Sequence, residues 1–236
     1  RQILRCAKVL NGTNCPILGI NMGNLGFLCE IDSSDVDSKL QKYLSGDAVI
    51  ETRNKLKINL VSSNSKKEYS ALNDLVVSRG SKIRVVNVEA LINGNHFATY
   101  KGDGIVIATA TGSTAYSLSL GGAILSPSIS NMIMKPIAAH TSLMGGLVIE
   151  KDVVISWKAS SNEDLSISVD GFIDNKIEDF DQIDVEIDND NKAFFLRSEN
   201  FENLYWSSLA QKLDLRKGDS ISCLLYTSDA ADDNVG

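Results

Sequence analysis

The hydrophobic pattern changes its period once along the chain, and this change limits the possible folds more than any other feature. Before Val49, apolar residues follow helical spacing or form a short continuous run, whereas after it they alternate with polar residues. Helical spacing is typical of amphipathic helices, and alternation is typical of half-buried strands. The sequence therefore predicts an α/β part followed by an antiparallel all-β part.

The α/β part carries the signals of two helices and one strand. Residues 3–10 are amphipathic and end at an Asn-Gly pair, and residues 15–20 form an apolar run suited to a buried parallel strand. This run leads into a glycine-rich turn. Residues 36–44 again show helical spacing, and Gly46 follows as a stop. We therefore expect residues 1–49 to be the end of a doubly wound α/β domain.

The all-β part carries strand and hairpin signals. Asn93-Gly94 and Asp170-Gly171 are dipeptides that favour two-residue hairpin turns. Helical spacing returns over residues 204–213, which predicts a helix that packs back on the first domain. The alternating apolar residues are Leu56, Ile58 and Leu60; Val86, Val88 and Ala90; Ile167 and Val169; and Ile183, Val185 and Ile187.

Composition narrows the class of protein. The 236 residues include 30 acidic and 23 basic side chains, a net charge of −7, which disfavours binding to nucleic acid or to a membrane surface. No apolar stretch approaches the roughly 18 residues of a spanning helix. With four cysteines, no Cys-x-x-Cys pair and two histidines, no metal site is expected. We expect a cytoplasmic protein with reduced thiols.

Both ends of the chain suggest that it has been cut. The first helix has no capping residue ahead of it, so we expect upstream sequence to be missing. Residues 223–236 match no expected element and resemble the translation of a sequencing adapter, which predicts an artefact. The alternative is a natural disordered acidic tail. Neither interpretation contributes to the fold.

A hydroxyl-rich segment gives the main functional signal. Residues 105–108 read as a strand, followed by a small turn and a helix that starts at Ser113 or Thr114. Such a turn offers N–H groups and hydroxyls to a ligand, and a helix N-terminus favours phosphate. Asp103, between two glycines, could hold a ribose hydroxyl or an amide. The alternatives are a simple connector and an ordinary turn carboxylate.

A second polar pair, Asn73-Asp74, precedes an apolar strand. Asn offers a donor and an acceptor, and Asp offers acceptors, which suits the sugar and base of a nucleoside. Asn-Asp is also a common turn, so the pair alone is a weak signal.

Together these segments resemble the NAD kinase family. The motifs that match in order and spacing are residues 21–28, Leu72-Asn73-Asp74, Asp103-Gly104, residues 111–122, Pro136 and His140-Thr141. The resemblance implies a partial Rossmann-like domain (1–49), an antiparallel β-sandwich that binds NAD (50–200) and a C-terminal helix packing back on the first domain (201–222). It also implies phosphorylation of the 2′-hydroxyl of the adenosine ribose of NAD, giving NADP.

The resemblance also implies roles for residues. Phe27 would lie against the adenine, although it could be a core aromatic, and Asn73 with Asp74 would hydrogen-bond the dinucleotide. Asp103 would act on the nicotinamide side. The catalytic aspartate of the Gly-Gly-Asp-Gly motif would lie just upstream of Arg1, leaving this chain inactive alone. The remaining expected binding residues are Arg84, Lys101, Thr114, Ala115, Tyr116, Ser117, Leu118 and Ser119.

The implied ligands are NAD and ATP, or polyphosphate in place of ATP, with Mg²⁺ or another divalent cation. The implied assembly is a homodimer or homotetramer, without nucleic acid or membrane. Two alternatives remain: a sensor that binds NAD or NADPH without catalysis, and a lipid kinase of the diacylglycerol or sphingosine type. The residues upstream of Arg1 distinguish enzyme from sensor. The lipid kinase is disfavoured because no membrane-facing segment is present.

Overall fold

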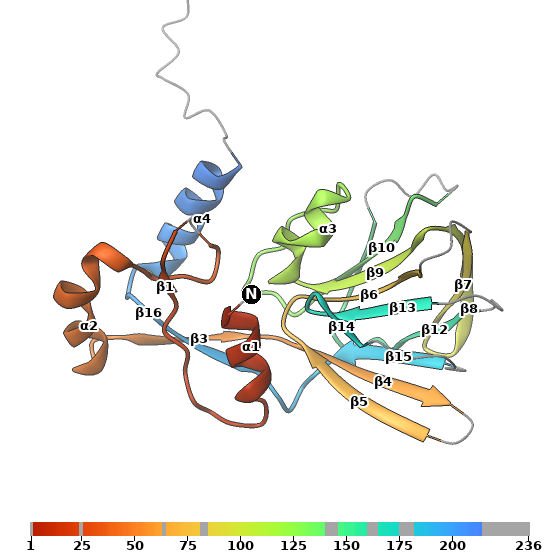
Figure 1. The fold of residues 1–236 in the computed structure, drawn as a ribbon, viewed down its shortest axis with the longest axis horizontal. Coiled ribbons are helices and arrows are strands. Elements are labelled where there is room, and N and C mark those ends of the chain that lie inside the picture. The colour runs from red at the N-terminus through yellow and green to blue at the C-terminus, as the bar shows by residue number, and fades with distance from the viewer. Residues whose placement is uncertain are drawn as a thin grey trace, which may run out of the picture.

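The computed structural model of the chain describes residues 2–23, 26–62, 65–80, 85–139, 146–159, 165–174 and 182–213. Figure 1 shows a small α/β module on one side, a larger β-sandwich on the other, and α1 (Gln2–Val9) between them. Among the described residues, no helix has the length and apolarity needed to cross a membrane. The predicted order of the two parts, an α/β part followed by an antiparallel part, is confirmed.

The α/β module begins with α1 and the parallel pair β1 (Ile20–Asn21) and β2 (Ile31–Asp32). A 3₁₀ turn, Ser33–Asp35, leads into α2 (Val36–Leu44), which has the predicted bounds. Gly46 follows with a φ of 99°, a left-handed conformation that ends the helix at little cost for glycine. The strand predicted over residues 15–20 is reduced to β1 and one bridge at Ile17.

Two strands from distant parts of the sequence extend this module. β3 (Val49–Arg53) pairs antiparallel with β16 (Ala193–Arg197), and Ile17 bridges Phe195 on β16. A small apolar core, made of Ala7, Ile17, Leu72, Ala193 and Phe195, packs beneath them. Both strands lie outside the sheets of the sandwich, although most of their residues fall within the predicted 50–200 span.

The sandwich consists of two six-stranded antiparallel sheets. In spatial order the first contains β11 (Leu147–Ile149), β10 (Met132–Ile137), β9 (Gly104–Thr109), β6 (Asp74–Arg79), β13 (Leu165–Val169) and β14 (Phe172–Asp174). The second contains β5 (Ser65–Ala71), β4 (Leu56–Ser62), β15 (Gln182–Ile187), β12 (Ile155–Ala159), β7 (Val86–Ile92) and β8 (Asn95–Gly102).

The core of the sandwich lies between these sheets and follows the predicted alternation. Leu56, Ile58 and Leu60 are buried on β4, and Trp157 is fully buried on β12. Burial of alternate apolar residues is the main favourable contribution to the stability of such a layer. The Asn93-Gly94 pair adopts left-handed φ values of 49° and 79°, as its hairpin turn requires.

The last helix, α4 (Phe201–Lys212), returns to the α/β module, as predicted. Figure 1 shows it beside β1, far from the strands at the opposite end of the sandwich. Its residues Tyr205, Ser208 and Gln211 face the turn that follows β1, across a cleft described below. The return of α4 therefore closes one side of that cleft.

Candidate functional site

A cleft of about 580 Å³ lies where the two modules meet. Its walls are the first turn of α1, the glycine-rich turn after β1, the loop between β5 and β6, the turn after β9, and α4. Of the residues predicted to bind the dinucleotide, Phe27, Asn73, Thr114 and Ala115 line this cleft. Segments as far apart in sequence as Gln2 and Tyr205 are thus gathered into one site.

Asn73 is held in this wall by the turn after β9. The backbone N–H of Thr109 donates to the Asn73 carbonyl at 2.9 Å, and the Thr109 hydroxyl donates to the Leu72 carbonyl at 2.6 Å. Gly112 packs so tightly against Asn73 that a Cβ there would overlap the Asn73 carbonyl oxygen. The Asn73 loop and the hydroxyl-rich turn therefore form one interlocked wall.

The hydroxyl-rich turn differs from the prediction in its detail. It forms a 3₁₀ turn, Gly112–Thr114, and a single helical turn, α3 (Tyr116–Ser119), rather than a long helix. The hydroxyl of Ser113 donates inward to the Ala110 carbonyl and accepts from the Leu125 N–H at 2.9 Å, so it caps no helix. The expected helix that starts at Ser113 or Thr114 is therefore reduced to a single turn, which carries little macrodipole, and the phosphate site at its N-terminus stays a prediction.

The other residues of this segment lead away from the cleft. Ser117 is fully buried against Gly122, where a Cβ would overlap its hydroxyl oxygen. Tyr116 and Ser119 are exposed, and Leu118 is half-buried. These four residues are not part of the cleft lining.

Asp74 stands next to Asn73 but is buried, outside the lining of the cleft. Burial, together with the nearby charge of Asp170, raises the pKa of Asp74 to about 7. The carboxyl group therefore exists in both protonation states near neutral pH. Such a group can accept a hydrogen bond when ionised and donate one when neutral.

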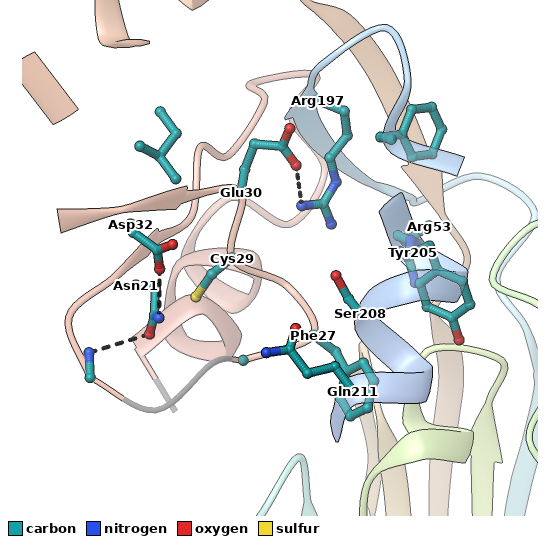
Figure 2. A pocket seen from close by; sticks show the side chains of 14 residues that line it. Asn21, Phe27, Cys29, Glu30, Asp32, Arg53, Arg197, Tyr205, Ser208 and Gln211 are labelled. Carbon is teal, nitrogen blue, oxygen red and sulfur yellow. Dashed lines mark hydrogen bonds and ion pairs between the residues drawn. The ribbon is translucent and has the colours of Figure 1, made fainter. Parts of the chain in front are cut away.

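A second cleft of about 470 Å³ adjoins the first, and Figure 2 shows its lining. Phe27, Cys29, Arg53 and Tyr205 line both clefts. Phe27 and Gln211 of α4 both line this cleft, and both are labelled in Figure 2. Phe27 is half-buried between the two spaces, so it is not a residue of the apolar core.

A buried ionic network supports the floor between the clefts. Arg53 donates to Glu51 at 2.6 Å and to the Thr111 hydroxyl at 3.2 Å. Arg197 joins Glu51 at 2.7 Å to Glu30 at 3.2 Å. Burial lowers the pKa of Arg53, and the charge of Glu51 opposes that change. Sequence reasoning missed these residues, because their alternation along β3 resembles an ordinary solvent-facing pattern.

Two other predicted residues lie elsewhere in the chain. Asp103 sits in the turn before β9 and pairs with Arg79 at 2.9 Å, with its side chain 40% exposed. Thr109 ends β9 one residue before Ala110, which lines the cleft, so at about 3.4 Å per residue Asp103 and Thr109 lie about 20 Å apart. Lys101 is exposed near Asp103 on β8. Arg84 lies outside the described residues, as do His140 and residues 223–236.

The described residues of the clefts form no cage of protein ligands for a metal ion. Within the described ranges, no group of three His, Cys, Asp or Glu side chains could hold one. Glu30 is bound to Arg197, and Asp32 accepts from the Asn21 amide at 2.9 Å. The carboxylates at the clefts are thus already engaged with protein groups.

Comparisons with known proteins agree with this architecture. Residues 2–48 match the model of the ATP-NAD kinase N-terminal domain, and residues 72–196 match that of the C-terminal domain. The NAD kinase of Caldanaerobacter subterraneus subsp. tengcongensis is 38% identical over 213 residues, which cover 89% of this chain and 75% of that protein. The NAD kinase of Clostridium beijerinckii is 42% identical, over 72% of this chain and 60% of that protein.

Solved structures give the same result. The yeast NADH kinase complexed with NADH has a TM-score of 0.83 and 27% identity, covering 93% of this chain and 65% of that one. An NAD kinase from Archaeoglobus fulgidus in complex with ATP shares the fold, with a TM-score of 0.70 and 23% identity over 82% of this chain and 73% of that one. The domain models, the curated relatives and the fold agree, and the chain belongs to the ATP-NAD kinase family.

Proposed function

We propose that the protein phosphorylates the 2′-hydroxyl of the adenosine ribose of NAD with ATP, giving NADP. The observation that carries this proposal is the single cleft that gathers Phe27, Asn73, Thr114 and Ala115 from three separate motifs. A cleft of about 580 Å³ is large enough for most of a dinucleotide. Polyphosphate is an alternative donor, and the cytoplasm is the expected compartment.

The chemistry asked of these residues is positioning. Phosphoryl transfer depends mainly on orientation and charge stabilisation, so the site needs oriented amides, hydroxyls and one base. Phe27 offers a face for the adenine, and the Asn73 amide offers a donor and an acceptor to the adenosine. The aspartate of the Gly-Gly-Asp-Gly motif would enter beside the first turn of α1, which lines the cleft.

A divalent cation, when bound with ATP, would neutralise the charge of the transferred phosphate. Glu30 and Asp32 already bind Arg197 and Asn21. We therefore propose that the phosphate oxygens of ATP supply most of the ligands of the cation.

Asp103 and Lys101 lie too far from the cleft to serve the same bound NAD in one chain. We propose that they act in the site of a second copy, within a homodimer or homotetramer. The test mixes two weakened variants of the chain extended upstream of Arg1, Asp103→Asn and Asn73→Ala, because one site of a mixed dimer then keeps both native residues. We expect kcat/KM for NAD to rise on mixing; a mixture no more active than the separate variants would contradict the shared site.

The test of the reaction is NADP formation from NAD, ATP and Mg²⁺. It compares residues 1–236 with the same chain extended by the residues that precede Arg1 in its coding sequence. We expect turnover only from the extended chain, and loss of turnover when its glycine-flanked aspartate becomes Asn. Asn73→Ala in that chain should lower kcat/KM for NAD about tenfold or more, because a buried polar contact is lost.

Asn95→Ala is the matched control, since Asn95 lies exposed at a hairpin remote from the clefts. Its activity should equal that of the unaltered chain. An extended chain that binds NAD tightly without turnover would be a sensor instead of a kinase. A chain that neither binds NAD nor forms NADP would overturn the proposal.

A further inference from the structure

The loop that presents Asn73 is held from one side by a single buried carboxylate. Asp170 accepts hydrogen bonds from three consecutive backbone N–H groups: Leu72 at 2.9 Å, Asn73 at 2.6 Å and Asp74 at 3.2 Å. The Asp170 N–H donates in turn to the Asp74 carbonyl at 2.9 Å. Consecutive N–H groups that converge in this way form an anion-binding concavity, and here the protein fills it with its own side chain.

Thr109 holds the same loop from the opposite side. Its hydroxyl donates to the Leu72 carbonyl at 2.6 Å and accepts from the Gly112 N–H at 3.0 Å. One hydroxyl therefore ties the Asn73 loop to the turn that carries Thr114 and Ala115. Thr109 and Asp170 are both buried, and neither lines the cleft.

Burying Asp170 next to Asp74 costs folding free energy, and the packing of the loop does not by itself require that cost. Burial raises the pKa of Asp170 even though three N–H groups stabilise its charge. Its charge also lies close to Asp74, whose own ionisation it disfavours. A loop without a role could end β5 in an ordinary turn, with its N–H groups toward water. Two carboxyl groups are instead kept together behind the cleft wall.

We infer that Asp170 and Thr109 are positioning residues for NAD: they fix the Leu72–Asp74 loop so that the Asn73 side chain meets the dinucleotide in the cleft. The inference rests on the proposed function, because it assigns these residues to NAD rather than to ATP. Neither residue touches the ligand, and both act through Asn73.

The first experiment compares Asp170→Asn with Asp188→Asn in the extended chain. Asn keeps one acceptor but turns an N–H₂ donor toward one or two of the three loop N–H groups. We expect KM for NAD to rise about tenfold or more, with KM for ATP within twofold of the unaltered value. Asp188 is a matched control, because its buried carboxylate also accepts loop N–H groups, from Asp190 at 3.0 Å and Asn191 at 2.9 Å, away from the clefts.

Asp188→Asn should lose stability without a change in KM for NAD. A similar rise of KM for NAD in both variants would mean that any buried loop carboxylate has this effect, and would overturn the inference. An unaltered KM for NAD in a folded Asp170→Asn protein would overturn it as well.

The second experiment covers the case in which Asp170→Asn does not fold. Thr109→Val keeps the shape of the side chain and removes the hydroxyl, whereas Thr109→Ser keeps the hydroxyl. We expect Thr109→Val to raise KM for NAD several-fold and Thr109→Ser to restore it. Equal values for the two variants would contradict the role of the hydroxyl.

Calorimetric NAD binding separates this inference from the proposed reaction. If the unaltered protein binds NAD but makes no NADP, the kinase reaction fails, and the Kd values of the same variants decide the role of Asp170 and Thr109. If the unaltered protein does not bind NAD, both proposals fail. Weakened binding in Asp170→Asn and Thr109→Val, with normal binding in Asp188→Asn and Thr109→Ser, supports the inference.

Discussion

Two groups of buried charges lie at the clefts, and they are built on opposite principles. Glu30, Glu51, Arg53 and Arg197 form a network in which each charge has a partner of opposite sign. Asp74 and Asp170 instead bring two carboxyl groups together. The first group joins β3 and β16 to the segment before β2, and the second lies behind the loop that carries Asn73.

The comparison separates scaffold from site. A buried charge is tolerated when an opposite charge and hydrogen bonds replace the lost water, as they do around Arg197. Burial first, and the charge of Asp170 second, drive Asp74 toward its neutral form, while Lys55 and the loop N–H groups offset only part of the cost at Asp170. Costs of this kind are concentrated at functional sites. The following predictions test whether the two groups differ in this way.

The largest effect is expected for Glu51→Gln. The substitution keeps the size of the side chain but leaves Arg53 and Arg197 with one buried carboxylate fewer. Breaking a buried ionic network by removing one partner costs about 3–5 kcal/mol of unfolding free energy. Urea unfolding measures this loss, with Glu68→Gln on the exposed strand β5 as the control. Equal losses in the two variants would show that the network contributes nothing.

An effect of opposite sign is expected for Asp74→Asn. Because the folded-state pKa of Asp74 is about 7, above its ordinary value of 3.8, the folded protein binds a proton that the unfolded chain releases. The stability that this group contributes is present below about pH 4 and is lost as pH rises through about 7. The substitution should therefore raise the unfolding free energy at pH 8 by about 2 kcal/mol, while weakening NAD binding.

Thermal unfolding at pH 4, 6 and 8 measures this difference. The gain of Asp74→Asn over the unaltered protein should be small at pH 4 and grow toward pH 8, and Asp152→Asn, in an exposed turn, should show no such trend. A gain that is the same at every pH would mean that the carboxyl group at Asp74 is not destabilised by burial.

The smallest effect is expected for Lys39→Ala. Lys39 pairs with Asp35 at 2.6 Å on the surface of α2, where both side chains are exposed to water. The Lys39 ammonium lowers the pKa of Asp35, yet exposed pairs of this kind contribute little to stability. Urea unfolding should not distinguish the variant from the unaltered protein. If Lys39→Ala lost as much unfolding free energy as Glu51→Gln, exposed and buried ion pairs would contribute equally, and the contrast between them would fail.

Local sequence patterns predicted the elements that depend least on contacts with distant segments. The bounds of α2 and the hairpin turn at Asn93-Gly94 follow from short-range spacing and from backbone conformation at asparagine and glycine. The alternation of Leu56, Ile58 and Leu60 gave the buried face of β4. Phe27, Asn73 and Thr114 were predicted as binding residues from motif resemblance, and they line one cleft.

At other positions, burial is the opposite of what the local hydrophobic pattern predicts. On β3 the apolar Ile50 is 59% exposed, whereas Glu51 and Arg53 are buried. Hydrophobicity alone predicts that Ile50 is buried and that Glu51 and Arg53 are exposed. The observed burial of Glu51 requires Arg197, more than a hundred residues further along the chain, to neutralise its charge. Ser113 likewise turned inward because the Leu125 N–H reaches its hydroxyl.

The sequence by itself determined the order of the two parts, the faces of the sandwich strands and the family to which the motifs belong. These depend on period, turn chemistry and residue identity, all of which are local. Only the tertiary structure decided that β3 and β16 leave the sandwich, that Asp103 lies at the end of β9 opposite to Thr109, and that Asp170 supports the Asn73 loop. The physical reason is that burial and hydrogen-bond partners of polar groups depend on which distant segments meet.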